Sequence, residues 1–231
     1  MKRVLHRLRH NVEAQLLWPL GLATGTLWGF LALANGMTSG ATRAADAWIL
    51  QWCRSAGAHG GAWGPAWLPD VMRDITALGS PTVLILVGTA VWAYLLLARQ
   101  TRMAWLSALS CLGGWATSTA LKGVFMRERP EFSFHGTLAG GYSFPSGHAM
   151  MSAIVFLTLA MLIARLAPRT RLRLYAMGVA TLLSGLVGMS RVYLGVHWAS
   201  DVVAGWMAGV AWALLVWAIA HWLQIGQEDS R

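Results

Sequence analysis

Long apolar stretches dominate this chain. A helix needs roughly 20 residues to cross the hydrocarbon core of a bilayer, which is about 30 Å thick. Six stretches approach or reach that length, and they cover residues 16–34, 81–98, 103–121, 149–164, 174–190 and 202–223. None carries the polar stripe that a surface helix of a soluble protein shows. The sequence therefore predicts an all-α, polytopic membrane protein with six transmembrane helices.

Composition supports the membrane class and excludes several others. Hydrophobic residues make up 56% of the 231 residues and charged residues only 12%, whereas soluble domains average about 25% charged residues. The mean hydropathy is +0.52. These values exclude a disordered chain, a collagen-like chain and a disulfide scaffold. The two cysteines, Cys53 and Cys111, indicate neither a disulfide framework nor a metal site. We expect a single transmembrane domain over residues 1–231.

The positive charge of the chain fits a placement in a membrane. Lys and Arg number 18 against 9 Asp and Glu. In a soluble protein this balance can indicate nucleic-acid binding, but here most basic residues lie between apolar stretches. The basic segments at 2–9, 99–102 and 165–173 are cytoplasmic by the positive-inside rule. Both termini are then cytoplasmic, and we expect no nucleic acid and no obligatory protein partner.

The first apolar stretch has a second interpretation. The basic residues before it and the Ala32-Leu33-Ala34 triplet resemble a secretory signal peptide with its cleavage site. However, the apolar run is longer than the about 7–15 residues that are usual for that class. We therefore expect a retained helix.

One long connection, residues 35–80, follows the first stretch on the extracytoplasmic side. It contains Trp48, Trp52, Trp63 and Trp67, and such aromatic residues favour the headgroup level of a bilayer. A short interfacial helical segment between the first two transmembrane helices explains them. An ordered loop packed over the bundle explains them equally well.

Polar residues gather in the two loops that precede the fourth and sixth apolar stretches. Both loops lie on the extracytoplasmic side, because they are separated by two crossings. Lys122, Arg129 and Arg191 border helix ends there, against the positive-inside trend, and they could surround one anion. Ser146 and Gly147 open a predicted helix, whose backbone N–H groups would point at the same anion. This pattern indicates an anion site built without a metal or another cofactor.

Two histidines and a carboxylate accompany these cations. His197 and Asp201 are four residues apart, so they lie one turn apart on one face if the last helix begins near His197. The carboxylate would fix the tautomer of His197 and leave its other nitrogen free to attack. His148 is a second imidazole for the opposite side of the anion. Phosphoester cleavage needs such a nucleophile, an acid and charge stabilisation.

These residues form three groups in a recognisable order. Lys122-x6-Arg129-Pro130, Pro145-Ser146-Gly147-His148 and Ser190-Arg191-x5-His197-x3-Asp201 resemble the three-part signature of the type 2 phosphatidic acid phosphatase family. The resemblance implies that His197 forms a phosphohistidine, Asp201 orients it and His148 protonates the leaving group. It also implies that the phosphoryl oxygens are held by Lys122, Arg129, Ser146, Gly147 and Arg191. It implies no metal.

Other charged residues near the signature have simpler interpretations. We interpret Arg127, Glu128 and Glu131 as a solvated ion cluster, with headgroup selection as the alternative, and His135 as a loop residue. Arg73 and Asp74 are expected to form a structural ion pair near the second transmembrane helix.

The resemblance implies a lipid phosphate in the bilayer as substrate. For bacterial members of that family the candidate substrates are undecaprenyl pyrophosphate, phosphatidylglycerophosphate, phosphatidic acid and lipid A phosphates. We expect one of the first two. The chain looks like a bacterial inner-membrane enzyme with its active site facing the periplasm. A lipid phosphotransferase with the same site stays open. A vanadate-dependent haloperoxidase shares the anion-site residues but lacks six spans. A lipid or anion transporter would more often show helices broken near the midplane.

Overall fold

The computed structural model describes residues 2–54, 62–130 and 140–228, and eight helices form that part of the chain. They are α1 (Lys2–Thr38), α2 (Arg43–Trp52), α3 (Leu68–Ala77), α4 (Pro81–Leu97), α5 (Thr101–Phe125), α6 (Gly147–Leu166), α7 (Thr170–Tyr193) and α8 (Ala199–Glu228). The all-α class is confirmed. Each of the six apolar stretches forms most of one long helix, namely α1 and α4 to α8.

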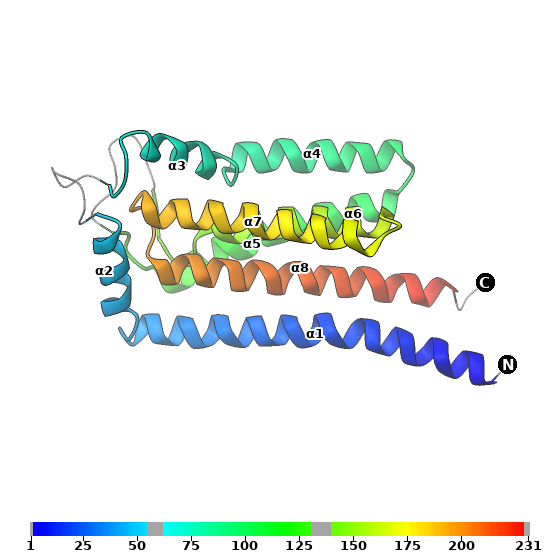
Figure 1. Cartoon of the computed structure of the whole chain (residues 1–231). Coiled ribbons are helices and arrows are strands. Elements are labelled where there is room, and N and C mark those ends of the chain that lie inside the picture. Colours follow the sequence, from blue (N-terminus) through cyan, green and yellow to red (C-terminus); the bar gives the residue numbers. More distant parts are fainter. Residues whose placement is uncertain (1, 55–61, 131–139, 229–231) are drawn as a thin grey trace.

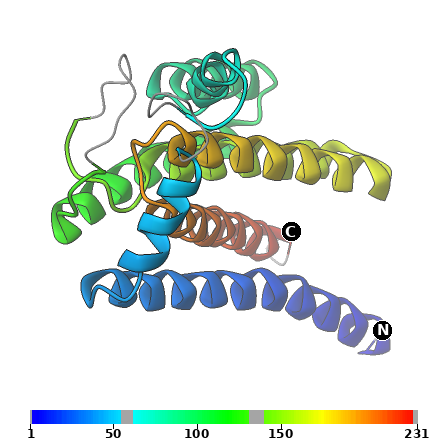
Figure 2. The same cartoon turned by 60° about the vertical axis from the view of Figure 1, so that its left-hand side comes forward.

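The long helices run side by side as a bundle (Figure 1). Both described ends of the chain lie at the same end of this bundle, at the right of Figure 1. At the other end α2 stands across the bundle, and the view in Figure 2 shows it bridging from α1 toward the end of α7. The connections that contain the predicted signature lie at this same end, because α6 begins and α5 and α7 end there.

Fewer helices than the six predicted are both long enough and apolar enough to count as membrane spans. Among the described residues, four helical segments qualify by length and apolar composition, namely Leu17–Thr38, Gly147–Leu166, Thr170–Tyr193 and Ala199–Trp222. A fifth qualifies if α3 and α4, which are bent by 41° at Gly79–Ser80, count as one broken span. α4 has only 17 residues, and α5 contains Arg102, Lys122 and several hydroxyl side chains, which lower its hydropathy. The protein is a multi-pass membrane protein.

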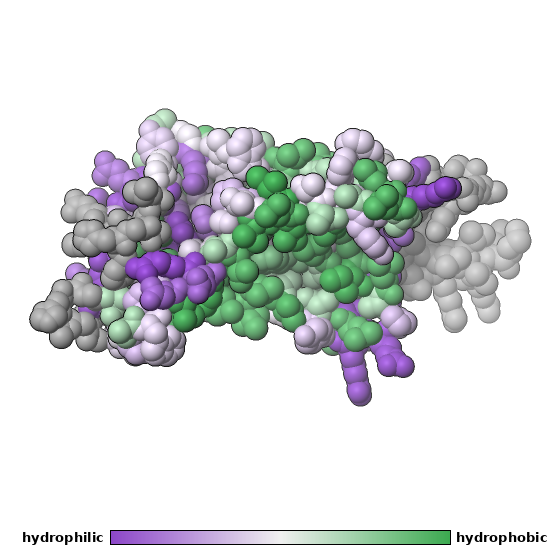
Figure 3. All heavy atoms as spheres, turned by 90° about the horizontal axis from the view of Figure 1, so that it is seen from above, coloured by the Kyte–Doolittle hydropathy of each residue, from purple (hydrophilic) through white to green (hydrophobic). Residues whose placement is uncertain are grey.

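The surface fits this class. One face of the molecule shows apolar side chains over its middle and hydrophilic side chains toward the two ends (Figure 3). Trp105, Trp115 and Leu112 of α5 are among the large apolar side chains that stay exposed in the isolated chain. Such exposure is costly in water and favourable in lipid.

The connection between α1 and α4 contains two helices, which favours the helical alternative for residues 35–80. In α2 the side chains of Asp46 and Leu50 are buried, whereas Trp48 and Trp52 are 67% and 56% exposed. One face of α2 therefore packs on the bundle and the opposite face presents two indoles outward. The N-terminus of α4 is capped by the Ser80 hydroxyl, which accepts from the Val83 N–H at 3.3 Å.

Two glycines bring α8 directly against α6. A Cβ on Gly205 would lie 2.7 Å from the carbonyl oxygen of Ser146, and one on Gly209 would lie 2.6 Å from that of Met150. Larger residues would push the two backbones apart. The contact fixes the start of α6 beside the start of α8, so the second and third groups of the signature meet.

Candidate active site

His197 and Asp201 lie together in the connection from α7 to α8. His197 is 1% exposed and Asp201 is fully buried. The Nδ1 atom of His197 lies 3.4 Å from Oδ2 of Asp201, and the same oxygen accepts from the Trp198 N–H at 3.0 Å. Helix α8 begins at Ala199, two residues later than His197, yet the predicted contact between imidazole and carboxylate is present.

The other ring nitrogen of His197 faces a guanidinium. Nε2 lies 3.0 Å from Nη1 of Arg129, and because a guanidinium can only donate, Nε2 is the accepting nitrogen. The proton of the neutral ring is then on Nδ1 and points to Asp201. Burial lowers the pKa of His197 from 6.5 to about 4, although the hydrogen bond and the charge of Asp201 act to raise it. At neutral pH this ring is neutral, with a lone pair on Nε2.

Arg129 is held in place by backbone carbonyls. Its guanidinium donates to the carbonyl oxygens of Val196 at 2.8 Å, Gly141 at 2.9 Å and Gly140 at 3.0 Å. Burial lowers the pKa of Arg129, while the charge of Asp201 acts in the opposite sense. This arginine joins the connection after α5 to the connection after α7, and it stays next to the lone pair of His197.

The second group of the signature forms the start of α6, as predicted. Ser146 precedes the helix, and its N–H donates to the carbonyl oxygen of Asp201 at 2.9 Å. The Ser146 hydroxyl is buried and has no hydrogen-bond partner among the residues that the structure describes. The bond between Phe144 and Pro145 just before it is cis. An unpartnered buried hydroxyl at a helix N-terminus is a suitable donor for an anion.

The remaining cations converge on the same place. A Cβ on Gly147 would lie 3.5 Å from Nζ of Lys122, so the ammonium group borders the start of α6. Arg191 is 5% exposed and donates to Thr76 Oγ1 at 3.0 Å, while its Nε is buried without a partner. The charges of Lys122, Arg129, Arg191 and His197 all act on the His148 imidazole. The structure thus brings together every predicted site residue.

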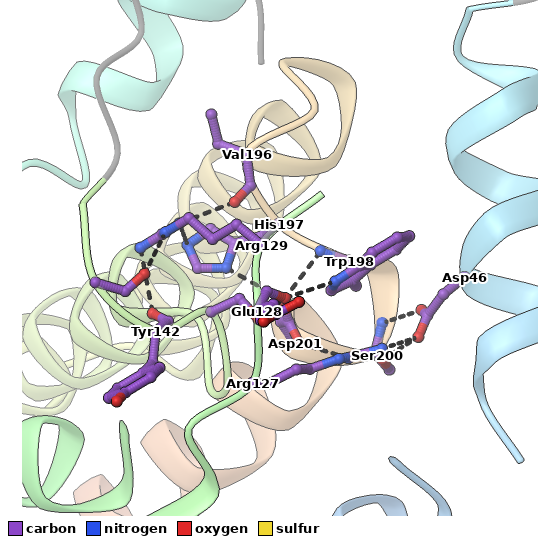
Figure 4. A network of polar contacts seen from close by, with 12 residues as sticks. Asp46, Arg127, Glu128, Arg129, Tyr142, Val196, His197, Trp198, Ser200 and Asp201 are labelled. Atoms are coloured by element: carbon purple, nitrogen blue, oxygen red, sulfur yellow. Dashed lines mark hydrogen bonds and ion pairs between the residues drawn. The ribbon is translucent and has the colours of Figure 1, made fainter. Parts of the chain in front are cut away.

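Arg127 is the first functional candidate that the sequence analysis missed. The solvated ion cluster predicted for it is wrong, because its side chain is only 14% exposed. Nη1 donates to Asp201 Oδ1 at 2.6 Å, and the guanidinium lies 5.4 Å from the ring centre of Trp198 (Figure 4). The Asp201 carboxylate therefore interacts with both His197 and Arg127.

Asp46 and Ser200 complete this network from α2 and α8. Asp46, 2% exposed, accepts from Arg127 Nη2 at 2.7 Å and from the Ser200 hydroxyl and N–H at 2.5 and 2.9 Å. Figure 4 shows these side chains in a row that leads from α2 to Asp201. One signal could have identified Asp46: it shares a face with Leu50, one turn away, and it is the one acidic residue of α2.

The other charged neighbours have minor roles. Glu128 contributes its carbonyl oxygen, which accepts from the Ser143 hydroxyl at 3.0 Å and from the Trp198 indole at 3.1 Å. Arg73 pairs with Asp70, not with Asp74 as predicted. The predictions for Glu131 and His135 lie outside the described residues.

The arrangement is chemically an oxyanion site beside a nucleophile. Cationic and N–H donors lie around a neutral imidazole whose Nε2 lone pair faces Arg129, and a second imidazole, His148, is close by. Within the described ranges, no group of three His, Cys, Asp or Glu side chains could hold a metal ion. Such a site suits attack on a phosphoryl group, whose negative oxygens the donors would bind.

Comparisons with known proteins agree with this chemistry. Residues 103–225, more than half of the chain, match the PAP2 superfamily. The chain is 33% identical over 152 residues to phosphatidylglycerophosphatase B of Bacillus subtilis, which covers 64% of this chain and 72% of that protein. It is 40% identical over 68 residues to an undecaprenyl-diphosphatase of Sulfolobus acidocaldarius, a match that spans 29% of each chain.

A solved structure extends the similarity to the fold. The crystal structure of the transmembrane PAP2 type phosphatidylglycerolphosphate phosphatase from Bacillus subtilis superposes with a TM-score of 0.77 at 29% identity. The superposition covers 85% of this chain and 94% of that one.

Proposed function

Because this chain belongs to the PAP2 superfamily, as a lipid phosphate phosphatase that hydrolyses phosphoric esters, we propose that it works through a phosphohistidine on His197. The orientation of the His197 ring carries this proposal. Nδ1 faces Asp201 at 3.4 Å and Nε2 faces Arg129 at 3.0 Å, so a phosphoryl oxygen bound to Arg129 would bring phosphorus next to the lone pair.

In the first step Nε2 of His197 attacks phosphorus and the bond from phosphorus to the leaving oxygen breaks. His148 gives its proton to that oxygen. Asp201 accepts the Nδ1–H and stabilises the positive charge that the ring gains. The developing charge on the phosphoryl oxygens is bound by Lys122, Arg129, Ser146, Gly147 and Arg191.

In the second step water hydrolyses the phosphohistidine. His148, now without its proton, accepts a proton from the attacking water as the bond from nitrogen to phosphorus breaks. Inorganic phosphate leaves and both histidines return to their starting states. The residues of this chain supply the nucleophile, the acid and the charge stabilisation, so we propose that no metal takes part.

We further propose six spans, formed by α1, α4, α5, α6, α7 and α8 of a single domain over 1–231. α5 has 25 residues, which is enough to cross a hydrocarbon core of about 30 Å. Taken together as one bent span, α3 and α4 are long and apolar enough to cross it as well. Both termini then lie on the cytoplasmic side of a bacterial inner membrane, and the site faces the periplasm. The same placement puts α2 in the interface, with Trp48 and Trp52 toward the headgroups.

The proposed substrate is undecaprenyl pyrophosphate or phosphatidylglycerophosphate. Its support is the similarity to phosphatidylglycerophosphatase B and to undecaprenyl-diphosphatase. In both lipids the phosphate lies at headgroup depth, where the proposed topology puts His197. No protein partner is needed to complete the site.

The test is phosphate release by the purified protein in detergent, across a panel of lipid phosphates, with His197→Ala beside the wild type. We expect release by the wild type alone, unchanged by EDTA and inhibited by vanadate, which mimics five-coordinate phosphorus. Equal rates from both proteins would refute the role of His197. Inhibition by EDTA that zinc or magnesium reverses would refute the metal-free reaction. A phosphorylated lipid product instead of inorganic phosphate would indicate phosphotransfer.

A further inference from the structure

A large apolar cleft lies away from the candidate active site. Its volume is about 940 Å³, and side chains of α1, α6, α7 and α8 line it. Among them are Trp18, Leu157, Met177, Val210 and Trp217. Along α6 the lining runs from Ala153 to Arg165, which is about 18 Å at a rise of 1.5 Å per residue. This length is close to half of a hydrocarbon core of about 30 Å.

One end of the cleft is basic. Arg165, Arg173 and His221 line it at the end of the bundle opposite to His197. Arg173 donates from Nε to the carbonyl oxygen of Ala167 at 3.1 Å, so its position is fixed beside the end of α6. Nε2 of His221 is buried without a hydrogen-bond partner, and the ring stacks on Trp217 at 5.2 Å.

We propose that this cleft binds one anionic phospholipid from the leaflet opposite to the active site. An acyl chain would pack against the apolar walls over the depth of one leaflet. The basic end suits a lipid phosphate whose headgroup also carries a second negative charge or a hydroxyl group. The substrate is a poorer match, since its phosphate must reach His197 at the other end of the bundle. The lipid is therefore a bound component and not the reacting molecule.

The test is native mass spectrometry of the protein exchanged into equal amounts of phosphatidylglycerol and phosphatidylcholine. We expect one phosphatidylglycerol to be retained preferentially by the wild type and by the control R169Q, whose residue directly precedes α7, four positions before Arg173, and does not line the cleft. R173Q should lose that preference about fivefold or more, as about 1 kcal/mol per basic residue implies. Gly185 lines the cleft with open space around it, so Gly185→Leu should lose the adduct without a change in charge.

Equal retention of both lipids by the wild type would overturn the proposal. So would unchanged retention in both R173Q and Gly185→Leu, or displacement of the adduct by a lipid phosphate substrate, which would assign the cleft to the substrate tail. None of these outcomes depends on phosphatase activity.

The network between α2 and Asp201 carries a second, independent inference. Asp201 accepts from His197 at Oδ2 and from Arg127 Nη1 at Oδ1, and Arg127 donates from Nη2 to Asp46. The positive charge of Arg127 therefore acts on both Asp46 and Asp201, and without Asp46 it would act on Asp201 alone. Because a hydrogen bond to a carboxylate weakens as that carboxylate is neutralised, Asp46 affects how strongly Asp201 holds the Nδ1–H of His197.

On the premise of the proposed function, we infer that Asp46 is a positioning residue that acts on Asp201 through Arg127. With Asp46 uncharged, Arg127 would pair with Asp201 only. The pKa of His197 would then fall further, because one nearby negative charge is gone, and Nε2 would be a weaker nucleophile. The predicted effect is on kcat more than on KM, since the polar partners of Asp46 are Arg127 and Ser200 and include none of the proposed phosphate-binding residues.

The test compares Asp46→Asn with Asp70→Asn, a carboxylate of α3 that pairs with Arg73 at the surface. We expect Asp46→Asn to lower kcat about 10-fold to 100-fold, by analogy with the loss of a residue that orients a metal ligand, and to move the acid limb of the kcat pH profile to lower pH. Asp70→Asn should change neither. Asp46→Glu should recover part of kcat.

Ser200→Ala keeps both charges and removes only the hydroxyl that Asp46 and Arg127 share, so it should lower kcat less and leave the acid limb in place. A wild-type kcat and profile for Asp46→Asn would overturn the inference while His197-dependent release in the wild type still stood. A raised KM with unchanged kcat would assign Asp46 to headgroup binding instead. A wild type without any release would refute the proposed function itself.

Discussion

At the scale of single residues, His197 is set by three neighbours that do different things. Asp201 orients the ring, Arg129 faces its lone pair, and burial of the ring keeps it neutral. The group is therefore available as a nucleophile at a pH at which an exposed histidine would be partly protonated.

The first prediction concerns this protonation state. Protonation of His197 removes the lone pair, and its pKa is lowered from 6.5 to about 4. The neutral form persists as the pH falls from 7, and activity should be lost only as the pH passes through about 4. A profile of kcat/KM against pH, with a diphosphate lipid as substrate, measures this. An acid limb centred at the ordinary value of 6.5 would contradict it.

The second prediction concerns Arg191, whose Nη1 is tied to Thr76 and whose Nε is buried without a partner. Arg191→Lys replaces a planar fork by a single ammonium group, and one oxyanion donor is worth about 10²–10³ in kcat. We expect a loss of that size in the rate of phosphate release. Arg171→Lys, at the far end of α7, is the matched control and should retain the wild-type rate. A full rate from Arg191→Lys would remove it from the phosphate site.

Element geometry determines whether these residues meet at all. α6 and α8 approach so closely at Gly205 that Ser146 can donate its N–H to the carbonyl oxygen of Asp201 at 2.9 Å. The start of one helix is thereby bonded to the start of the other.

The third prediction follows from that contact. Gly205→Ala would place a methyl group 2.7 Å from a backbone oxygen, and overpacking of this kind costs about 1–3 kcal/mol. We expect a lower Tm in detergent and reduced turnover, because Ser146 and Asp201 would separate. Gly178→Ala in α7, where a Cβ meets nothing within 4 Å, should keep both. Equal Tm values for the two variants would show that α8 can shift without cost.

Local sequence patterns predicted the elements well and the partners of Arg127 poorly. Apolar runs identify α1 and α4 to α8 because lipid imposes their length and composition. They miss the helix ends, since polar residues beyond the core can stay helical, as in α8, which continues to Glu228. The Asp46 to Arg127 pair joins residues 81 positions apart, and no local periodicity encodes such a pairing.

The site itself could be predicted because its residue types are unusual for their place. Cations and histidines at extracytoplasmic helix ends need a partner or a role, and this selected Lys122, Arg191 and His148. Arg127 has the same charge and a similar place, but its partners are protein carboxylates. Only the fold distinguishes an arginine that pairs with protein from one that is left to bind a ligand.

On the scale of the whole molecule, both described chain ends lie at one end of the bundle and the candidate site at the other (Figure 1). Termini at one end are what the proposed six crossings would produce. With the larger share of basic loop residues at that end, the positive-inside rule supports the proposal that this end faces the cytoplasm.

The fourth prediction tests this topology with single cysteines in a background that carries both Cys53→Ser and Cys111→Ser. Ser39→Cys lies between α1 and α2, and Thr170→Cys lies at the start of α7. A membrane-impermeant maleimide applied to spheroplasts should label Ser39→Cys alone, and both variants after permeabilisation. Labelling of Thr170→Cys in intact spheroplasts would reverse the orientation and put the site in the cytoplasm.

The most direct measurement is the capture of the phosphohistidine. Wild type, His148→Ala and His197→Ala are mixed with the best lipid substrate, quenched in base and examined by intact mass spectrometry and peptide mapping. We predict an acid-labile phosphoryl adduct on His197 that is short-lived in the wild type and absent in His197→Ala. In His148→Ala the adduct should be detected when its hydrolysis is slower than its formation. A phosphoryl group on another residue, or continued turnover by His197→Ala, would contradict the mechanism.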